Sequence, residues 1–267
     1  MKERHPVCTV LVASCDKYAD LLHPFSILWK KYWPDCPFET VLVTESQPAD
    51  DLCFDRIVSC GPGGNWCSRL VAALNLIQTR YVILLCDDYY LDSPVDTALI
   101  LKRLDQAMRF DAVDLRMIPN PVTKIPYKED LREYRKNTAY CIATQAGIWN
   151  REFLQKLATG KASIWEFERY GSFDLAGETR PILGTSTKEF PFLDAVHKGC
   201  WEPWGVKVLK DNGIDYDFSK RGLPPFKTRL IEGIKAIIFR CVPTTLLVRV
   251  QNALGAGAKE KPSTGGR

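Results

Sequence analysis

The segment Tyr81–Cys86 (YVILLC) has no charged residue and is followed at once by two aspartates, Asp87 and Asp88. An apolar run without polar alternation is typical of a strand that is buried on both faces of a parallel sheet. Two adjacent carboxylates at the end of such a strand repel each other and lose hydration, unless a cation or hydrogen-bond donors compensate. The segment therefore predicts a buried strand whose carboxyl end carries a functional acidic pair.

The first 90 residues alternate between apolar runs and segments with helical spacing. Strands are predicted at residues 7–13, 38–43, 56–59 and 81–86, and helices at residues 18–33 and 65–78. This order predicts an α/β fold with a doubly wound, mostly parallel sheet flanked by helices, whose ligands bind outside the carboxyl ends of the strands. Residues 14–16 and the acidic pair follow two such strands and are expected to face one cleft.

Beyond residue 90 the pattern is less regular and predicts a mixed second half. Helices are predicted at residues 95–110, 150–157 and 164–169, a long surface loop at 120–136, and strands at 113–117, 139–144, 181–184 and 190–196.

Charge divides the 267 residues into two parts. From residue 220 on there are ten Lys or Arg against two Glu, so this part carries +8 and the first 219 residues carry −4. The body therefore lacks the basic surplus of a nucleic-acid-binding domain. We predict a globular domain at 1–219, a basic amphipathic helical appendage at 220–254 and a disordered tail at 255–267.

One face of the predicted appendage helix is apolar. This face could pack on the body, contact an anionic membrane surface or pair with a partner, and the sequence leaves these three interpretations open. The ten cysteines are scattered, form no Cys-x-x-Cys pair, and suit a reducing compartment. No apolar run is long enough to span a bilayer, and the first residues run straight into a strand. We expect a cytoplasmic protein, with peripheral contact at the inner membrane face as one interpretation of the basic appendage.

The acidic pair suits a hard divalent cation. Such an ion can be held by one or two carboxylates while its other positions take water and phosphate oxygens. The alternative is that Asp88 or Asp92 only caps a helix beginning near Pro94. Because Asp92 and Ser93 already suffice as caps, the functional interpretation of Asp87 and Asp88 is preferred.

The chain resembles the GT-A glycosyltransferases, in particular a bacterial group linked to surface polysaccharide synthesis. The resemblance covers about residues 7–205 and rests on four motifs. These are Ser-Cys-Asp-Lys-Tyr at 14–18, Tyr-Trp-Pro-Asp at 32–35, Asp-Asp-Tyr at 87–89 and Trp-Glu-Phe-Glu at 165–168. It implies a GT-A, Rossmann-like fold and a metal-assisted reaction, with Mn²⁺ or Mg²⁺ at Asp87 and Asp88.

The resemblance also implies a donor site on matching positions. Ser14 and Asp16 would hold the nucleoside, Trp66 would line the nucleotide pocket, and Arg69 would reach the pyrophosphate. Each has a structural alternative: Asp16 as a helix cap, Trp66 as a core residue, and Arg69 as an exposed helix residue.

An acceptor-side base is also implied for a reaction that inverts configuration. Glu166 is the first choice, because it lies in a segment that resembles the acceptor region of the family, and Glu168 is the second. The alternative for both is an exposed acid on a short helix. His197 is a candidate third metal ligand or a structural histidine.

The predicted function is transfer of a sugar from a nucleotide diphosphate sugar to a growing surface glycan or lipid-linked acceptor, with Asp88 and Glu166 as catalytic residues. Two alternatives are a sugar nucleotidyltransferase and a non-catalytic, membrane-associated nucleotide-sugar binding protein. No Gly-rich, basic triphosphate loop follows the first strand, which disfavours the nucleotidyltransferase.

Overall fold

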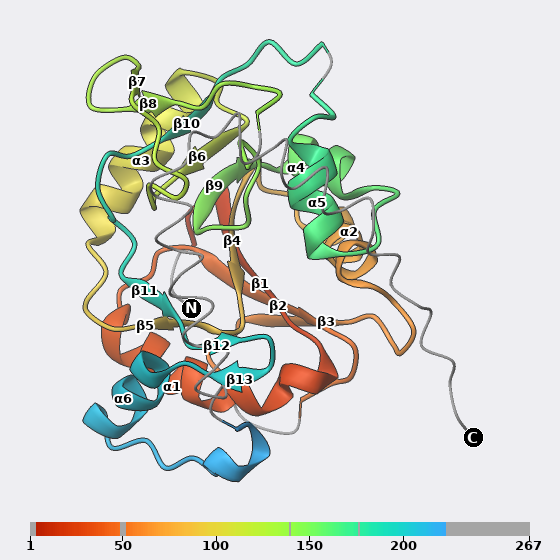
Figure 1. Ribbon diagram of the computed structural model, residues 1–267, viewed down its shortest axis with the longest axis vertical. Helices are drawn as coiled ribbons and strands as arrows, with labels where there is room; N and C mark the ends of the chain where they lie inside the picture. The colour runs from red at the N-terminus through yellow and green to blue at the C-terminus, as the bar shows by residue number, and fades with distance from the viewer. Residues whose placement is uncertain (1–3, 49–51, 139, 176, 223–267) are drawn as a thin grey trace, which may run out of the picture. The chain divides into compact units, whose positions relative to one another are not determined.

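The structure is a computed structural model that describes residues 4–48, 52–138, 140–175 and 177–222. Its centre is a nine-stranded sheet with the order β3-β2-β1-β4-β9-β6-β10-β8-β7 (Figure 1). The strands are β1 (Cys8–Ala13), β2 (Glu39–Thr44), β3 (Arg56–Ser59), β4 (Tyr81–Cys86), β6 (Asp114–Arg116), β7 (Ile125–Pro126), β8 (Arg132–Glu133), β9 (Gly147–Asn150) and β10 (Ile182–Gly184). Among these described strands seven point the same way and only β8 and β9 oppose them, so the predicted mostly parallel α/β sheet is confirmed.

Helices cover both faces of this sheet (Figure 1). They are α1 (Leu22–Tyr32), preceded by the 3-10 helix η1 (Asp16–Leu21), α2 (Trp66–Leu76), α3 (Thr97–Arg109), α4 (Arg151–Ala158), α5 (Ile164–Gly171) and α6 (Pro203–Asp211), followed by the 3-10 helix η2 (Phe218–Lys220). Side chains at the N-caps of four of them, Asn65, Asp96, Asn150 and Ser163, accept a hydrogen bond from the first turn. These caps fix where α2, α3, α4 and α5 begin.

The continuous apolar strands are explained by burial on both faces. Val10 and Val12 of β1 contact the hydrophobic core that α1 and α3 cover, whereas Leu11 and Ala13 contact the core beneath α2, α4 and α5. Successive side chains of a strand point to opposite faces, so a strand between two helical layers needs apolar residues throughout. Ala13 pairs with Cys86 in the β1–β4 register, which brings the carboxyl ends of these two strands side by side.

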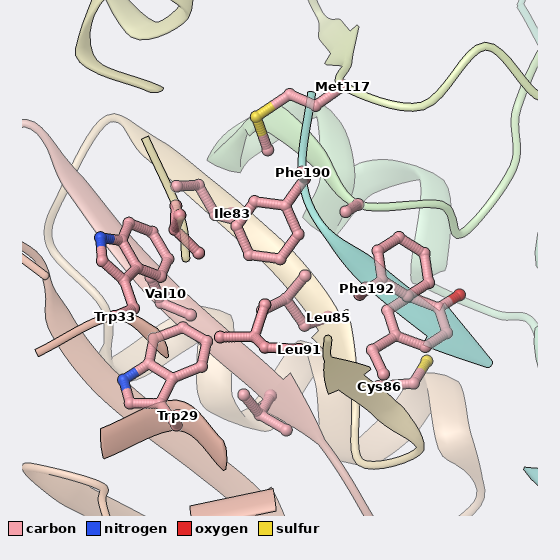
Figure 2. Close-up of a cluster of buried hydrophobic side chains, with 14 of the residues drawn as sticks. Val10, Trp29, Trp33, Ile83, Leu85, Cys86, Leu91, Met117, Phe190 and Phe192 are labelled. Carbon is pink, nitrogen blue, oxygen red and sulfur yellow. The ribbon is translucent and has the colours of Figure 1, made fainter. Parts of the chain in front are cut away.

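Aromatic side chains fill the core on the α1 side. Figure 2 shows Trp29, Trp33, Phe190 and Phe192 gathered around the β4 residue Leu85. Phe192 belongs to β11 (Phe192–Asp194), which pairs antiparallel with β5 (Tyr89–Leu91), directly after the acidic pair. A second short ladder joins β12 (Val196–His197) to β13 (Cys200–Trp201). The strand predicted at 190–196 is thus divided between β11 and β12.

The second half contains one incorrect prediction. Residues 140–144 form a turn, a bend and irregular structure, so the strand predicted at 139–144 is wrong for the residues that the structure describes. Cys141 and Ile142 are buried as loop residues: the Ile142 amide donates to Ser172 Oγ, and Arg116 donates to the Cys141 carbonyl oxygen. Side chains satisfy this backbone in place of a neighbouring strand. The strand that does occur, β9, begins at Gly147 and was not predicted.

The remaining predicted elements of the second half are confirmed within a few residues. They are the helices at 95–110, 150–157 and 164–169 and the strands at 113–117 and 181–184; the loop at 120–136 carries the two-residue strands β7 and β8. The described residues belong to one compact unit that ends at Gly222. The predicted appendage at 220–254, except its first three residues, and the predicted tail at 255–267 lie outside the described residues. Within the described chain, no helix is long and apolar enough to cross a bilayer.

Gly205 of α6 lies against the segment that continues from β11. A Cβ atom at Gly205 would stand 2.5 Å from the carbonyl oxygen and 2.8 Å from the Cα of Ala195. The Ala195 amide in turn donates to the carbonyl oxygen of Asp88 at 2.8 Å. Because glycine has no side chain, α6 can pack directly against Ala195, whose backbone is bonded to the acidic pair.

We predict that Gly205→Ala destabilises the protein by about 1–3 kcal/mol, because the methyl group overlaps backbone atoms. Replacement of a helical glycine by alanine ordinarily stabilises by up to about 1 kcal/mol, so the sign of the change is diagnostic. Chemical denaturation measures the free energy of unfolding. Lys207→Ala on the exposed side of α6 is the control, expected within about 0.5 kcal/mol of wild type. A stabilised Gly205→Ala protein would contradict the close packing.

Candidate functional site

A cleft with a cavity volume of about 510 Å³ opens at the carboxyl ends of β1 and β4. This is where ligands bind in open α/β sheets. The lining residues at 13–18 and 66–69 are called the first wall and those at 144–198 the second wall; the acidic pair belongs to neither. The lining residues are Ala13, Ser14, Cys15, Tyr18, Trp66, Arg69, Cys86, Asp87, Asp88, Tyr89, Thr144, Gln145, Ile164, Trp165, Glu168, Asp194, Val196, His197 and Lys198.

The structure brings together five of the seven predicted site residues. They are Ser14, Trp66, Arg69, Asp87 and Asp88, which all line the cleft. Asp16 and Glu166 are not among its lining residues.

Asp87 is 7% exposed and accepts a hydrogen bond from Ser14 Oγ at 2.5 Å. Burial raises its pKa to about 7, although the hydrogen bond from Ser14 and the positive charge of Arg221 act in the opposite direction. The protein therefore offsets only part of the cost of a negative charge on Asp87. A cation in the cleft would favour it.

Asp88 is fixed through its main chain and leaves its carboxylate in the cleft. Its carbonyl oxygen accepts from the amides of Ala195 and Tyr90, at 2.8 and 3.1 Å. Burial, followed by the negative charges of Asp87 and Asp194, raises the pKa of Asp88 well above its ordinary value. Like charges gathered in this way disfavour each other unless a positive ligand joins them.

The donor set of the pair suits a divalent cation. Mg²⁺ and Mn²⁺ prefer oxygen ligands, and Mg²⁺ needs only one or two carboxylates when phosphates and waters complete its shell. Among the described residues, no three His, Cys, Asp or Glu side chains are grouped so that they could hold a metal ion. His197 lines the cleft but forms no such group with Asp87 and Asp88, so the candidate role as third ligand is not supported.

Arg69 is buried, so the alternative of an exposed helix residue is wrong. Its Nε donates to the carbonyl oxygen of Ser14 at 3.2 Å, and one terminal nitrogen donates to Glu45 at 3.0 Å and to the carbonyl oxygen of Gly64 at 2.7 Å. Arg69 therefore ties the end of β1 to the Gly-rich turn before α2. It brings positive charge to the same side of the cleft as Ser14.

Trp66 is the first residue of α2 and is partly buried. Its ring packs edge-on against Phe167 of α5, with 5.5 Å between the ring centroids. Trp66 therefore lines the cleft and also packs between α2 and α5. Its role beside a nucleotide stays a prediction.

Asp16 is exposed and bonds to the loop after β2. Its two carboxylate oxygens accept from the amide of Ser46 at 2.8 Å and from its hydroxyl at 2.6 Å. These hydrogen bonds lower the pKa of Asp16. Because the N-cap position of η1 belongs to Cys15 and no side chain caps it, the helix-cap alternative for Asp16 is wrong.

Glu166 and Glu168 have different surroundings on α5. Glu166 accepts from the amide of Ala162 at 2.8 Å, while its own amide donates to Ser163 Oγ at 3.2 Å, so Glu166 takes part in capping the helix. Glu168 lines the cleft, and its Oε1 accepts from the amide and the hydroxyl of Thr144 at 2.7 and 2.6 Å. The geometry favours Glu168 over Glu166 as a group that can reach a ligand.

The cleft also contains residues to which the sequence analysis assigns no role. Tyr89 donates to the carbonyl oxygen of Thr144 at 2.8 Å and stacks on Phe192 at 4.1 Å. Trp165 and Asp194 line the cleft as well. The signal for Trp165 was its place three residues before Glu168, because such residues share a helix face.

Arg221, near the end of the described chain, is buried beside the first wall. It donates to both carboxylate oxygens of Asp20 and to the carbonyl oxygen of Lys17, and its guanidinium lies 4.4 Å from the ring centroid of Tyr18. Tyr18 lines the cleft. Arg221 therefore holds η1 in place and lowers the cost of charge on the acidic pair.

No protein-family model matches the chain, and no curated protein matches it in sequence. Solved structures with a similar fold include S. aureus TarS 1-349, with a TM-score of 0.44 and 11% identity over 70% of this chain. A cytidylyltransferase from Leptospira borgpetersenii has a TM-score of 0.40 and 14% identity over 78% of this chain and 96% of its own. This chain spans 59% of TarS 1-349. These similarities concern the fold alone, so the function is argued below from the residues of the cleft.

The buried carboxyl of Asp87 predicts a specific dependence of stability on pH. Because its folded pKa of about 7 lies above the unfolded value of about 4, the folded protein keeps a proton that the unfolded chain loses, and stability falls as pH rises through this window. Asp87→Asn removes this effect. At each pH we compare the free energy of unfolding of the variant with that of the wild-type protein, without metal or nucleotide present. The difference in favour of the variant should be about 1–3 kcal/mol larger at pH 7.5 than at pH 4.5.

Urea denaturation at the two pH values measures this difference. Asp16→Asn is the control: the pKa of Asp16 is lowered by its hydrogen bonds with Ser46, so its replacement should give no gain at pH 7.5. An Asp87→Asn protein that is less stable than wild type at pH 7.5 would show that the carboxylate is already compensated.

Proposed function

We propose that the protein is a glycosyltransferase that moves a sugar from a nucleotide diphosphate sugar to a glycan or lipid-linked glycan acceptor. The observation that carries this proposal is the pair of adjacent carboxylates, Asp87 and Asp88, at the end of the buried strand β4 and between the two walls of the cleft. A site of this kind has unfavourable negative charge of its own and gains from a cation that a diphosphate would share.

The first wall suits the donor. Mn²⁺ or Mg²⁺ held by Asp87 and Asp88 would neutralise the leaving diphosphate. Arg69, which forms an ion pair with Glu45, holds its guanidinium on this side, and the backbone N–H groups at the start of α2 favour anions. Ser14 orients Asp87 through its hydroxyl, and Trp66 offers a ring beside the nucleotide. Contact between Asp16 and the ribose stays a prediction.

The second wall suits the acceptor. In the proposed step the acceptor oxygen bonds to the anomeric carbon while the bond from that carbon to the diphosphate oxygen breaks. The nucleoside diphosphate leaves with the electron pair, and the proton of the acceptor hydroxyl passes to a base. Glu168 fits this role, because it lines the cleft and Thr144 fixes its orientation.

Asp88→Asn should lower turnover by at least about a thousandfold, because it removes charge at the point where the leaving diphosphate must be neutralised. The measurement is donor hydrolysis and transfer with UDP-, GDP- and dTDP-sugars. Circular dichroism and thermal unfolding confirm that the variant is folded. Full activity of Asp88→Asn would contradict the proposal.

Calorimetry with the same nucleotide sugars, with and without manganese, tests donor binding directly. We expect at least one to bind, more tightly with manganese. Binding of none would contradict a nucleotide-sugar enzyme and favour a scaffold role. Release of pyrophosphate from a nucleoside triphosphate and a sugar phosphate would instead identify a nucleotidyltransferase.

Glu168→Gln and Glu166→Gln form a matched pair on one helix. Glu168→Gln should lower kcat for transfer by about 10²–10⁴-fold with donor affinity retained, because the amide cannot accept a proton. Glu166→Gln should stay near wild type, because glutamine can replace glutamate in a capping box. Steady-state kinetics of both variants measures the difference. If a folded Glu166→Gln protein loses transfer while Glu168→Gln stays active, the general base is Glu166 and not Glu168.

A further inference from the structure

Trp165 is unusually exposed for a residue that lines a cleft. It is one of the residues that line the cavity, yet 57% of it remains accessible to solvent. An indole exposed inside a concave site that also holds polar groups can receive the apolar face of a ligand.

The helix that carries Trp165 is held firmly. Ser163 caps its first turn, and Phe167 packs against Trp66 on one side and Trp149 on the other, at 5.5 and 5.9 Å between ring centroids. Trp165 and Glu168 are three residues apart and therefore share one face of α5. The indole is thus presented from a fixed element, one turn from the candidate base.

The wall around Trp165 combines an apolar ring with hydrogen-bonding groups. Gln145 supplies an amide, and Glu168 and Asp194 supply carboxylates, while His197 and Lys198 also line the wall. A pyranose ring has an apolar face of C–H groups and a rim of hydroxyls, so it can lie on an indole while its hydroxyls reach the amide and carboxylates. The two carboxylates of this wall outnumber its one lysine, Lys198, and this disfavours an anionic phosphate.

Glu168 also limits what can lie on Trp165. A base must be within hydrogen-bond reach of the acceptor hydroxyl, so the acceptor lies beside Glu168 and hence beside Trp165. In the proposed function the donor diphosphate lies near Arg69 and the start of α2, on the other wall.

We propose that Trp165 is the stacking platform for the acceptor, and that the reacting hydroxyl belongs to a sugar ring and not to a lipid phosphate. This inference rests on the proposed glycosyl transfer. It adds to that function the residue on which the sugar ring of the acceptor lies.

The test uses the full chain with whichever nucleotide sugar it hydrolyses and a panel of octyl glucoside, galactoside, mannoside and N-acetylglucosaminide, beside farnesyl phosphate. We expect transfer to at least one octyl pyranoside. Trp165→Ala should raise the acceptor KM about tenfold or more, because loss of stacking removes binding and not chemistry. Donor hydrolysis should stay within about twofold, and Trp165→Phe should retain most of the acceptor affinity.

Two exposed aromatic residues that lie outside the cleft serve as controls. Tyr170 and Phe173 are 62% and 52% exposed and stand on α5 or directly after it. Tyr170→Ala and Phe173→Ala should leave the acceptor KM within about twofold of wild type. A comparable effect in these controls would show that the loss is not specific to the cleft and would overturn the assignment.

Three further outcomes would overturn the inference. If Trp165→Ala raises the donor KM and leaves the acceptor KM unchanged, the ring binds the nucleobase. If farnesyl phosphate is the acceptor and no octyl pyranoside is, the acceptor class is wrong. If the wild-type protein neither binds nor hydrolyses any nucleotide sugar, the proposed function itself fails, and the inference fails with it.

Discussion

Burial of negative charge at the end of β4 is the constraint on which the site depends. Asp87 is almost completely enclosed, and Asp88 follows it along a backbone that Ala195 and Tyr90 hold in place. A hydrogen bond from Ser14 and the charge of Arg221 offset part of the cost, yet the pKa of each carboxyl stays above its ordinary value. The rest of the fold supplies the stability that this arrangement costs. Such costs are found mainly at functional sites.

The same strand end also organises the opposite wall. Directly after the acidic pair, Tyr89 enters β5, stacks on Phe192 of β11 and donates to the carbonyl oxygen of Thr144. Thr144 then donates twice to Glu168. A chain of packed and hydrogen-bonded residues therefore connects the acidic pair to the candidate base, so the spacing of the two walls follows from the fold.

The parallel half could be predicted because its strands are buried on both faces and show as continuous apolar runs. The second half could not be predicted as fully. β9 has only four residues, begins with Gly147, and becomes a strand because β4 and β6 leave a space between them, which is a tertiary constraint. Conversely, Cys141 and Ile142 look like strand residues because they are buried, but their backbone bonds to side chains. Short apolar segments report burial more reliably than secondary structure.

The predicted site divides in the same way. Ser14, Asp87 and Asp88 could be placed from topology alone, because parallel strands bring their carboxyl ends to one edge of the sheet. The choice between Glu166 and Glu168 depended on the phase of one helix. The signal was present in the sequence, since Ser163 and Glu166 have the spacing of a capping box and that pattern assigns Glu166 to the helix start. Once α5 begins at that cap, Trp165 and Glu168 fall together on the face that lines the cleft. A single N-cap thus decides which carboxylate and which ring a ligand would meet.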